Sequence, residues 1–192
     1  ATRENLRRAV QTLADRTGPE DLVFIYMTSH GSHEHELVLD LPRLQLADLP
    51  ADALASALAP LKDRDKVIVI SACYSGGYID SLKDQKTLIM TASRADRVSF
   101  GCSEEADFTY FGDALFAQAL NHTDDLRQAF SMASATVAER EAAEGFDASE
   151  PQIWAPSEVL AHWQRLRQQQ ARKALQSNAD NETGHAKNAS SH

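Results

Sequence analysis

Two apolar runs, each followed by a reactive side chain, constrain the fold of this chain more than any other feature. Residues 22–27 and 67–70 are almost entirely β-branched, aromatic or aliphatic, which is typical of strands buried on both faces of a parallel sheet. His30-Gly31 follows the first run, and Cys73 follows the second. The runs therefore predict an α/β fold with a reactive group at the end of two strands.

The segment between the runs predicts that these two strands are neighbours in the sheet. Residues 50–59 are rich in Ala and Leu and should form a helix, so residues 30–73 can make a strand-helix-strand crossover. Parallel neighbours end at the same edge of a sheet, where open α/β folds bind their ligands. We therefore expect His30 and Cys73 to meet at that edge.

Further patterns predict the elements that complete and cover the sheet. Helices are expected over residues 2–16, 78–82, 112–120, 124–143 and 157–175, and strands over 37–41, 87–91 and 151–154. The polar connection 93–110 is long enough to suggest a substrate loop. Residues 176–192 have almost no apolar anchor, so we expect a disordered tail after a single domain over residues 1–175.

Composition narrows the classes of function. With 192 residues and 43% hydrophobic content, the chain is long enough for one domain with a sizeable core. Its net charge of -9 argues against binding to nucleic acid or to anionic lipid. Two cysteines are too few for a disulfide scaffold, so Cys73 suits a working thiol and Cys102 a packing residue.

The apolar runs are also too short for a membrane span, and the chain does not open with a secretory signal. The sequence therefore predicts a soluble domain without membrane contact from this segment. It begins at Ala1 without an initiator Met, which leaves room for an upstream signal or anchor and leaves the compartment open.

Cys73 has the neighbours that a nucleophilic thiol needs. A thiolate close to a base can attack an acyl carbon. Gly76 and Gly77 leave room for a substrate backbone, and main-chain amides in the turn can bind an oxyanion. The alternative is that Cys73 is a small core residue, because free cysteine is among the most buried residue types. Its pairing with His30 in one crossover favours the chemical role.

Two other chemistries fit parts of the same segments. His33 and His35 lie close enough to His30 in the sequence to suggest a zinc site, although a solvated loop rich in Glu explains them more simply. The turn after the second run is similar to the nucleophile elbow of serine hydrolases around Ser75. In that motif, however, a glycine stands where this chain has Cys73.

Four motifs follow one another with compatible spacing, at residues 24–32, 69–76, 91–102 and 108–113. Together they resemble the legumain family, which comprises asparaginyl endopeptidases and the catalytic subunit of GPI transamidase within the caspase-like clan of cysteine peptidases. The short connections are most similar to bacterial members. The resemblance implies an open, mostly parallel caspase-like sheet flanked by helices, with no metal or organic cofactor required.

The resemblance also implies a role for individual residues. Cys73 corresponds to the nucleophile and His30 to its acid-base partner, while the main-chain amides of Gly31 and Cys73 correspond to the oxyanion hole. Ser99 and Asp113 fall where the family lines the pocket for the side chain preceding the scissile bond. A helix-start carboxylate explains Asp113 equally well.

The chain departs from the family in two places. Ser71 stands two positions before the nucleophile, where legumains have an acidic residue, so its expected role in substrate binding does not imply a preference for Asn. The first strands of the family, which supply a basic pocket residue, have no counterpart. We therefore expect an amino-terminally truncated domain with an exposed sheet edge beside the strand that precedes His30.

The implied reaction is hydrolysis of a peptide or protein substrate. The Cys73 thiolate would attack the peptide carbonyl, His30 would protonate the leaving amine, and water would hydrolyse the resulting thioester. If an amine replaced the water, the product would come from transamidation or ligation. A catalytically inactive caspase-like binding domain is the remaining alternative.

Overall fold

A four-stranded sheet forms the centre of the structure, a computed structural model that describes residues 2–40, 46–101 and 108–189. The strand order is β1-β4-β5-β6, with bounds Leu22–Thr28, Asp65–Ser71, Thr87–Thr91 and Gln152–Trp154. β1, β4 and β5 run parallel, and β6 pairs antiparallel with β5. The predicted α/β class with a mostly parallel sheet is confirmed, and the segment predicted over 151–154 is its last strand.

β4 lies inside the sheet and is buried on both faces, as its sequence predicts. Val67 and Val69 belong to the core on one face, and Ile68 and Ile70 to the core on the other. All four are 0% exposed. Because successive side chains of a strand point to opposite faces, only a continuous apolar run can satisfy both cores at once.

β1 is an edge strand of the described sheet and is less buried than β4. Its described partner is β4 alone, and the helix α1 (Arg3–Arg16) precedes it instead of a strand that would cover the other side. Phe24 and Tyr26 on this strand remain 37% and 41% exposed. The structure therefore has the open edge that was predicted, while the existence of strands before residue 1 stays a prediction.

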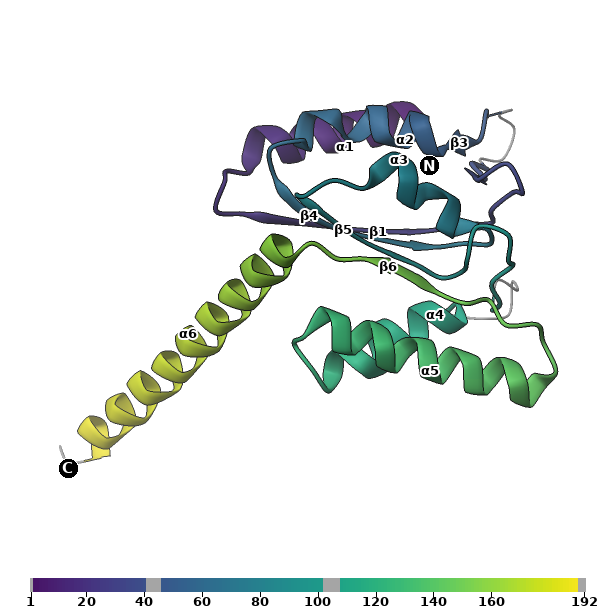
Figure 1. The fold of residues 1–192 in the computed structure, drawn as a ribbon. Coiled ribbons are helices and arrows are strands. Elements are labelled where there is room, and N and C mark those ends of the chain that lie inside the picture. The colour runs from purple at the N-terminus through teal and green to yellow at the C-terminus, as the bar shows by residue number, and fades with distance from the viewer. Residues whose placement is uncertain (1, 41–45, 102–107, 190–192) are drawn as a thin grey trace.

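Helices cover one face of the sheet with segments from the first half of the chain (Figure 1). α1, α2 (Ala51–Leu58) and α3 (Ile79–Leu82) lie on this side, together with the short helices η1 (Ala59–Leu61) and η2 (Ser75–Tyr78). Val10, Leu54 and Leu58 pack against β4 in the core of this face. The predicted crossover helix between β1 and β4 is α2.

The other face is covered by segments from the second half of the chain (Figure 1). Three short helices of different type follow one another along the chain: the α-helix α4 (Tyr110–Gly112), the π-helix η3 (Asp113–Gln118) and the 3-10 helix η4 (Ala119–Asn121). The long helix α5 (Leu126–Glu144) comes next. Asp125 caps α5 by accepting hydrogen bonds from two main-chain amides, and Gly145 ends it with a φ of 75°. The predicted apolar face of α5 packs in this core through Leu126, Phe130, Ala133 and Val137.

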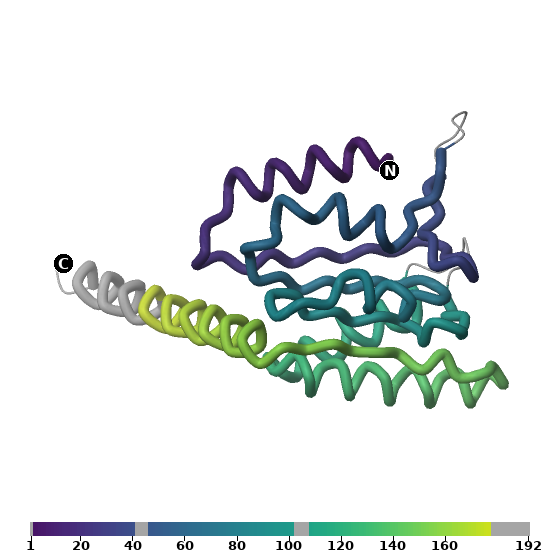
Figure 2. The backbone as a smooth tube through the Cα atoms, turned by 45° about the horizontal axis from the view of Figure 1, so that its top comes forward, coloured from purple at the N-terminus to yellow at the C-terminus, as the bar shows by residue number. Residues whose placement is uncertain are grey.

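Two elements differ from their predicted extents. β2 (Glu36–Leu37) pairs with β3 (Leu49–Pro50) and is shorter than the strand expected over 37–41, whose last position lies outside the described residues. α6 (Ser157–Ala189) continues past residue 175 and projects from the body in both views (Figures 1 and 2). The disordered tail expected over residues 176–192 stays a prediction.

Candidate active site

The register of β1 and β4 brings His30 and Cys73 to the same edge of the sheet. The two strands pair residue by residue, and their last pair is Thr28 with Ser71. His30 lies two residues after Thr28, and Cys73 lies two residues after Ser71. Parallel pairing keeps this equal offset, so both side chains leave the sheet at its carboxyl edge. The two strand ends therefore lie at one edge of the sheet, as predicted, while a contact between the His30 and Cys73 side chains stays a prediction.

Gly31 shows how closely the two turns approach each other. A Cβ atom at this position would lie 2.0 Å from the Cys73 carbonyl oxygen and 3.0 Å from its carbonyl carbon. Only glycine allows this approach, since the displaced atoms would be main-chain atoms that cannot move aside. Within the described residues, neither the Gly31 nor the Cys73 main-chain amide donates a hydrogen bond to another group.

Ser99 is the residue that the structure places against the Cys73 sulfur. Its main-chain N–H donates to Sγ at 3.2 Å, its main-chain oxygen lies 3.4 Å from Sγ, and its hydroxyl lies 3.8 Å away. Ser99 is 9% exposed, whereas Cys73 is half-buried. Of the residues expected to line a substrate pocket, Ser99 is therefore the one in direct contact with the thiol.

The turn that carries Cys73 is held in a specific shape. Tyr74 adopts the left-handed conformation with a φ of 57°, which is uncommon for a non-glycine residue. Its main-chain N–H donates to the Arg97 oxygen at 2.8 Å. A Cβ atom on Gly76 would lie 2.6 Å from the Ala95 nitrogen and 2.8 Å from the Ser93 oxygen. The segment 93–99 therefore wraps closely around this turn.

His30 is exposed beside a large cavity. Its main-chain oxygen accepts a hydrogen bond from the Val38 N–H at 3.0 Å, while its imidazole has no hydrogen-bond partner among the described residues. The cavity has a volume of 490 Å³ and lies between β1 and the segment after β2. Tyr26, Leu37 and Leu39 contribute to its walls. The imidazole is thus accessible from solvent.

His33 and His35 both face Tyr74 rather than one another. The Tyr74 hydroxyl lies 2.8 Å from His33 Nε2 and its carbonyl oxygen lies 3.1 Å from His35 Nδ1. The His33 and Tyr74 rings also pack together with centroids 4.0 Å apart. In the part of the chain that the structure describes, no three His, Cys, Asp or Glu side chains gather as a metal site would require.

Ser71 and Asp113 are linked to the site through Thr109. The Ser71 side chain is 0% exposed, and its hydroxyl lies 2.7 Å from Thr109 Oγ1. Thr109 Oγ1 in turn accepts from the Gly112 N–H at 3.0 Å, which caps α4. Asp113 is half-buried and accepts a hydrogen bond from Gln118 Nε2 at 2.9 Å. Ser71 therefore supports the helix start that carries Asp113.

The two remaining candidates do not provide a nucleophile. Ser75 is 0% exposed, and its hydroxyl points to Ser93 at 3.3 Å, so the serine-hydrolase alternative has no accessible oxygen. Cys102 lies outside the described residues, as does part of the proposed substrate loop.

Tyr78 makes contacts near this edge of the sheet that the sequence did not reveal. The Tyr78 hydroxyl accepts from the Leu37 N–H at 2.7 Å and donates to the Leu49 oxygen. It thereby ties β2 and β3 to the helix after Cys73, and burial raises its pKa. Its partners are 41 and 29 positions away in the sequence, so no local sequence pattern predicts these hydrogen bonds.

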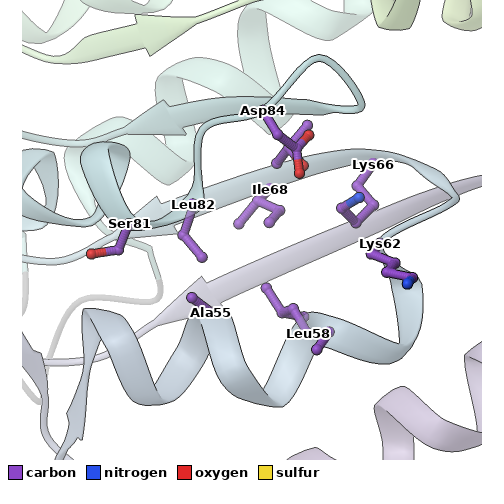
Figure 3. A pocket seen from close by; sticks show the side chains of 10 residues that line it. Ala55, Leu58, Lys62, Lys66, Ile68, Ser81, Leu82 and Asp84 are labelled. Atoms are coloured by element: carbon purple, nitrogen blue, oxygen red, sulfur yellow. The ribbon is translucent and has the colours of Figure 1, made fainter.

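A smaller cavity of 110 Å³ lies at the other end of β4 (Figure 3). Its lining includes Lys66, Leu82 and Asp84. The Lys66 ammonium donates to the main-chain oxygens of Leu61 and Arg64, at 3.0 and 2.8 Å. Burial lowers the pKa of this amine. This cavity is therefore separate from the edge that carries Cys73.

A model of the peptidase C13 family matches residues 5–162, which contain both strand ends and the segment around Ser99. The chain belongs to the peptidase C13 family. The resemblance to the legumain family is therefore confirmed at the level of the family. No curated protein matches the chain.

The fold is similar to that of a solved caspase. The crystal structure of caspase-1 from Spodoptera frugiperda aligns with a TM-score of 0.58 and 17% sequence identity, covering 81% of this chain and 68% of that one. At this identity the likeness concerns the fold alone. Together with the family match, it makes this peptidase C13 chain a member of the cysteine peptidases with a caspase-like fold. None of its described helices has the length and apolar character needed to span a membrane.

Proposed function

We propose that this peptidase C13 chain is a cysteine-type endopeptidase in which Cys73 and His30 form the catalytic dyad. The observation that carries the proposal is the shared register of β1 and β4, which delivers both side chains to one edge at equal distance from their last strand pair. The partial exposure of Cys73 and the exposure of His30 support it, because both must reach a substrate.

The dyad would cleave a peptide bond in two steps. In the first, the proton of the Cys73 thiol passes to the His30 imidazole while sulfur bonds to the peptide carbonyl carbon. The carbon-nitrogen bond then breaks, and His30 returns the proton to the leaving amine, which leaves a thioester. In the second step water attacks the thioester and gives up a proton through His30, and the carboxylic acid leaves as the thiol re-forms.

The oxyanion of both steps would be bound by the main-chain amides of Gly31 and Cys73. Their availability within the described residues supports this role, as does the direct contact between the two turns. Amides fixed in a rigid turn stabilise a developing negative charge without reorganising during the reaction.

Ser99 and Asp113 would line the pocket for the substrate side chain before the scissile bond. The contact of Ser99 with the Cys73 sulfur supports its part directly. Asp113 belongs to the helical segment that Ser71 anchors through Thr109, so Ser71 would act behind the pocket wall. A carboxylate there would favour substrates that carry hydrogen-bond donors or positive charge.

Thiol labelling in a Cys102→Ala background tests the proposal, because Cys73 is then the sole cysteine. The protein is incubated with a mixed peptide library, with and without prior iodoacetamide treatment, and products are identified by mass spectrometry. We expect Cys102→Ala to cleave peptides and iodoacetamide to abolish cleavage while adding one label. A Cys73→Ala variant should lose cleavage by about 10⁴-fold or more.

Two results would contradict the proposal. Cleavage by Cys73→Ala at the rate of the unmodified protein would remove the thiol from the mechanism. Cleavage that resists iodoacetamide but stops with a serine-directed reagent would do the same. Repeating the assay with an added amine nucleophile separates hydrolysis from transamidation, because a ligated product differs in mass from the free acid.

A further inference from the structure

Ser93 and Ser75 form a closed hydrogen-bond cluster directly behind the Cys73 turn. Ser93 follows β5 by two residues, and Ser75 is the first residue of η2. Both are 0% exposed. The Ser75 N–H donates to Ser93 Oγ, and the Ser93 N–H donates to Ser75 Oγ, each at 3.2 Å. The two hydroxyls lie 3.3 Å apart.

The Ser93 hydroxyl joins the main chain on both sides of the nucleophile. Ser93 Oγ lies 3.1 Å from the Ala72 carbonyl oxygen, to which its proton is donated. The same oxygen accepts the Ser75 N–H from beyond Cys73. One side chain that follows the neighbouring strand β5 therefore bridges residues 72 and 75, with Cys73 between them.

The Ser93 hydroxyl uses all of its hydrogen-bonding capacity. A serine hydroxyl has one proton and two acceptor lone pairs. The Ser93 proton goes to the Ala72 oxygen, so its lone pairs take the Ser75 N–H and the Ser75 hydroxyl proton. The Ala72 oxygen can only accept, so this is the arrangement in which both hydroxyl protons have an acceptor, and it ties the turn to the residues after β5.

We infer that Ser93 is a positioning residue for the Cys73 thiol. The turn places the non-glycine Tyr74 at a φ of 57°, a conformation that needs support from its surroundings. The Ser93 bridge supplies that support while leaving the sulfur free to face Ser99. Removing the hydroxyl lets the turn relax, which moves the sulfur relative to His30 and the oxyanion amides. This inference rests on the proposed peptidase function of the dyad.

Three variants in the Cys102→Ala background test this role. Ser93→Ala removes the bridge, and Ser75→Ala removes the second hydroxyl but keeps the Ser93 bond to Ala72. Ser149→Ala is the matched control, because Ser149 is 1% exposed and its hydroxyl has no hydrogen-bond partner among the described residues. The readouts are the rate of Cys73 alkylation by iodoacetamide across pH, kcat and KM for a cleaved peptide, and the thermal melt.

Ser93→Ala should shift the pH profile of alkylation and lower kcat by about 10- to 100-fold, as expected for a small displacement of a catalytic group. KM should change by less than about threefold, because substrate contacts are kept. Ser75→Ala should show smaller changes of the same kind, and Ser149→Ala should match the parent in the alkylation profile and in kcat.

A lower melting temperature of Ser93→Ala with an unchanged alkylation profile and kcat would overturn the inference, because Ser93 would then be purely structural. If Ser93→Ala does not fold, an unchanged profile and kcat in Ser75→Ala overturn it. The alkylation profile needs no substrate. A shifted profile in a chain that cleaves no peptide would therefore retain the positioning role while rejecting the proposed function.

Discussion

The two ends of β4 carry reactive side chains in opposite situations. At the amino end, Lys66 is 3% exposed and its amine is bound by two main-chain oxygens beside a small cavity (Figure 3). At the carboxyl end, Cys73 is half-buried and His30 is exposed. The Lys66 amine is therefore buried and hydrogen-bonded, whereas Cys73 and His30 are accessible to solvent.

The two ends differ in which groups make the supporting hydrogen bonds. At the Lys66 end the side chain itself makes the hydrogen bonds that hold the chain. At the Cys73 end the supporting bonds come from the residues around the thiol, chiefly Ser93, Ser75 and Tyr74. A side chain that is not needed as a support remains available for a reaction.

The sharpest test of this contrast is His30→Ala. We expect kcat for peptide cleavage to fall by about 10²- to 10⁴-fold, because the general acid and base are lost. The free energy of unfolding should change by less than about 0.5 kcal/mol, since an exposed imidazole without a described hydrogen-bond partner supports nothing. Steady-state kinetics and denaturant unfolding measure the two effects.

His33→Ala is the matched control, because it removes a second exposed histidine from the same loop. It should keep kcat within about threefold of the parent. If kcat fell equally in the two variants, the loss would come from a change of the whole loop, and His30 would have no separate role.

Lys66→Met tests the structural end and should act on stability alone. We expect a loss of about 1–3 kcal/mol in the free energy of unfolding near neutral pH, because the Arg64 oxygen loses its donor. The Leu61 oxygen keeps a hydrogen bond from the Arg64 N–H. Activity per folded molecule should be unchanged. Lys62→Met, at an exposed neighbour in the same cavity wall, should stay within about 0.5 kcal/mol.

The pH dependence of this stability has a definite sign. Burial lowers the pKa of Lys66 from its ordinary value of 10.5, so the unfolded chain binds more protons than the folded one between the lowered pKa and 10.5. The Lys66 contribution to stability should therefore rise as pH increases through that window. Denaturant titrations at several alkaline pH values should show this rise in the parent relative to Lys66→Met, and parallel curves would contradict it.

Tyr74→Phe should have the smallest effect, although Tyr74 lies next to Cys73. It removes only the exposed hydrogen bond to His33 and keeps the ring contact and the main-chain bonds. We expect kcat/KM within about threefold and stability within about 0.5 kcal/mol of the parent. A loss of more than about tenfold in kcat/KM would show that the hydroxyl takes part in the site.

The sequence was sufficient to predict the sheet and its two strand ends. Continuous apolar runs of β-branched residues have one stable environment, between two layers of helices, and the Ala-rich segment between them requires a crossover. The sequence also predicted a helix from residue 157, where α6 begins, although Leu175 on this helix is 71% exposed. Local pattern alone does not distinguish an isolated helix from a disordered polar tail.

The sequence alone thus determined that the strands before His30 and Cys73 would end at one edge of a parallel sheet. The hydrophobic pattern and the positions of the glycines were sufficient, because both are properties of neighbouring residues. Only the tertiary structure decided that Ser99 contacts the Cys73 sulfur, that Ser71 is bound to Thr109, and that Ser93 bridges the turn around Cys73. The physical reason is that each of these hydrogen bonds joins residues from different elements. Whether such a bond forms depends on distances that exist only once the layers have packed.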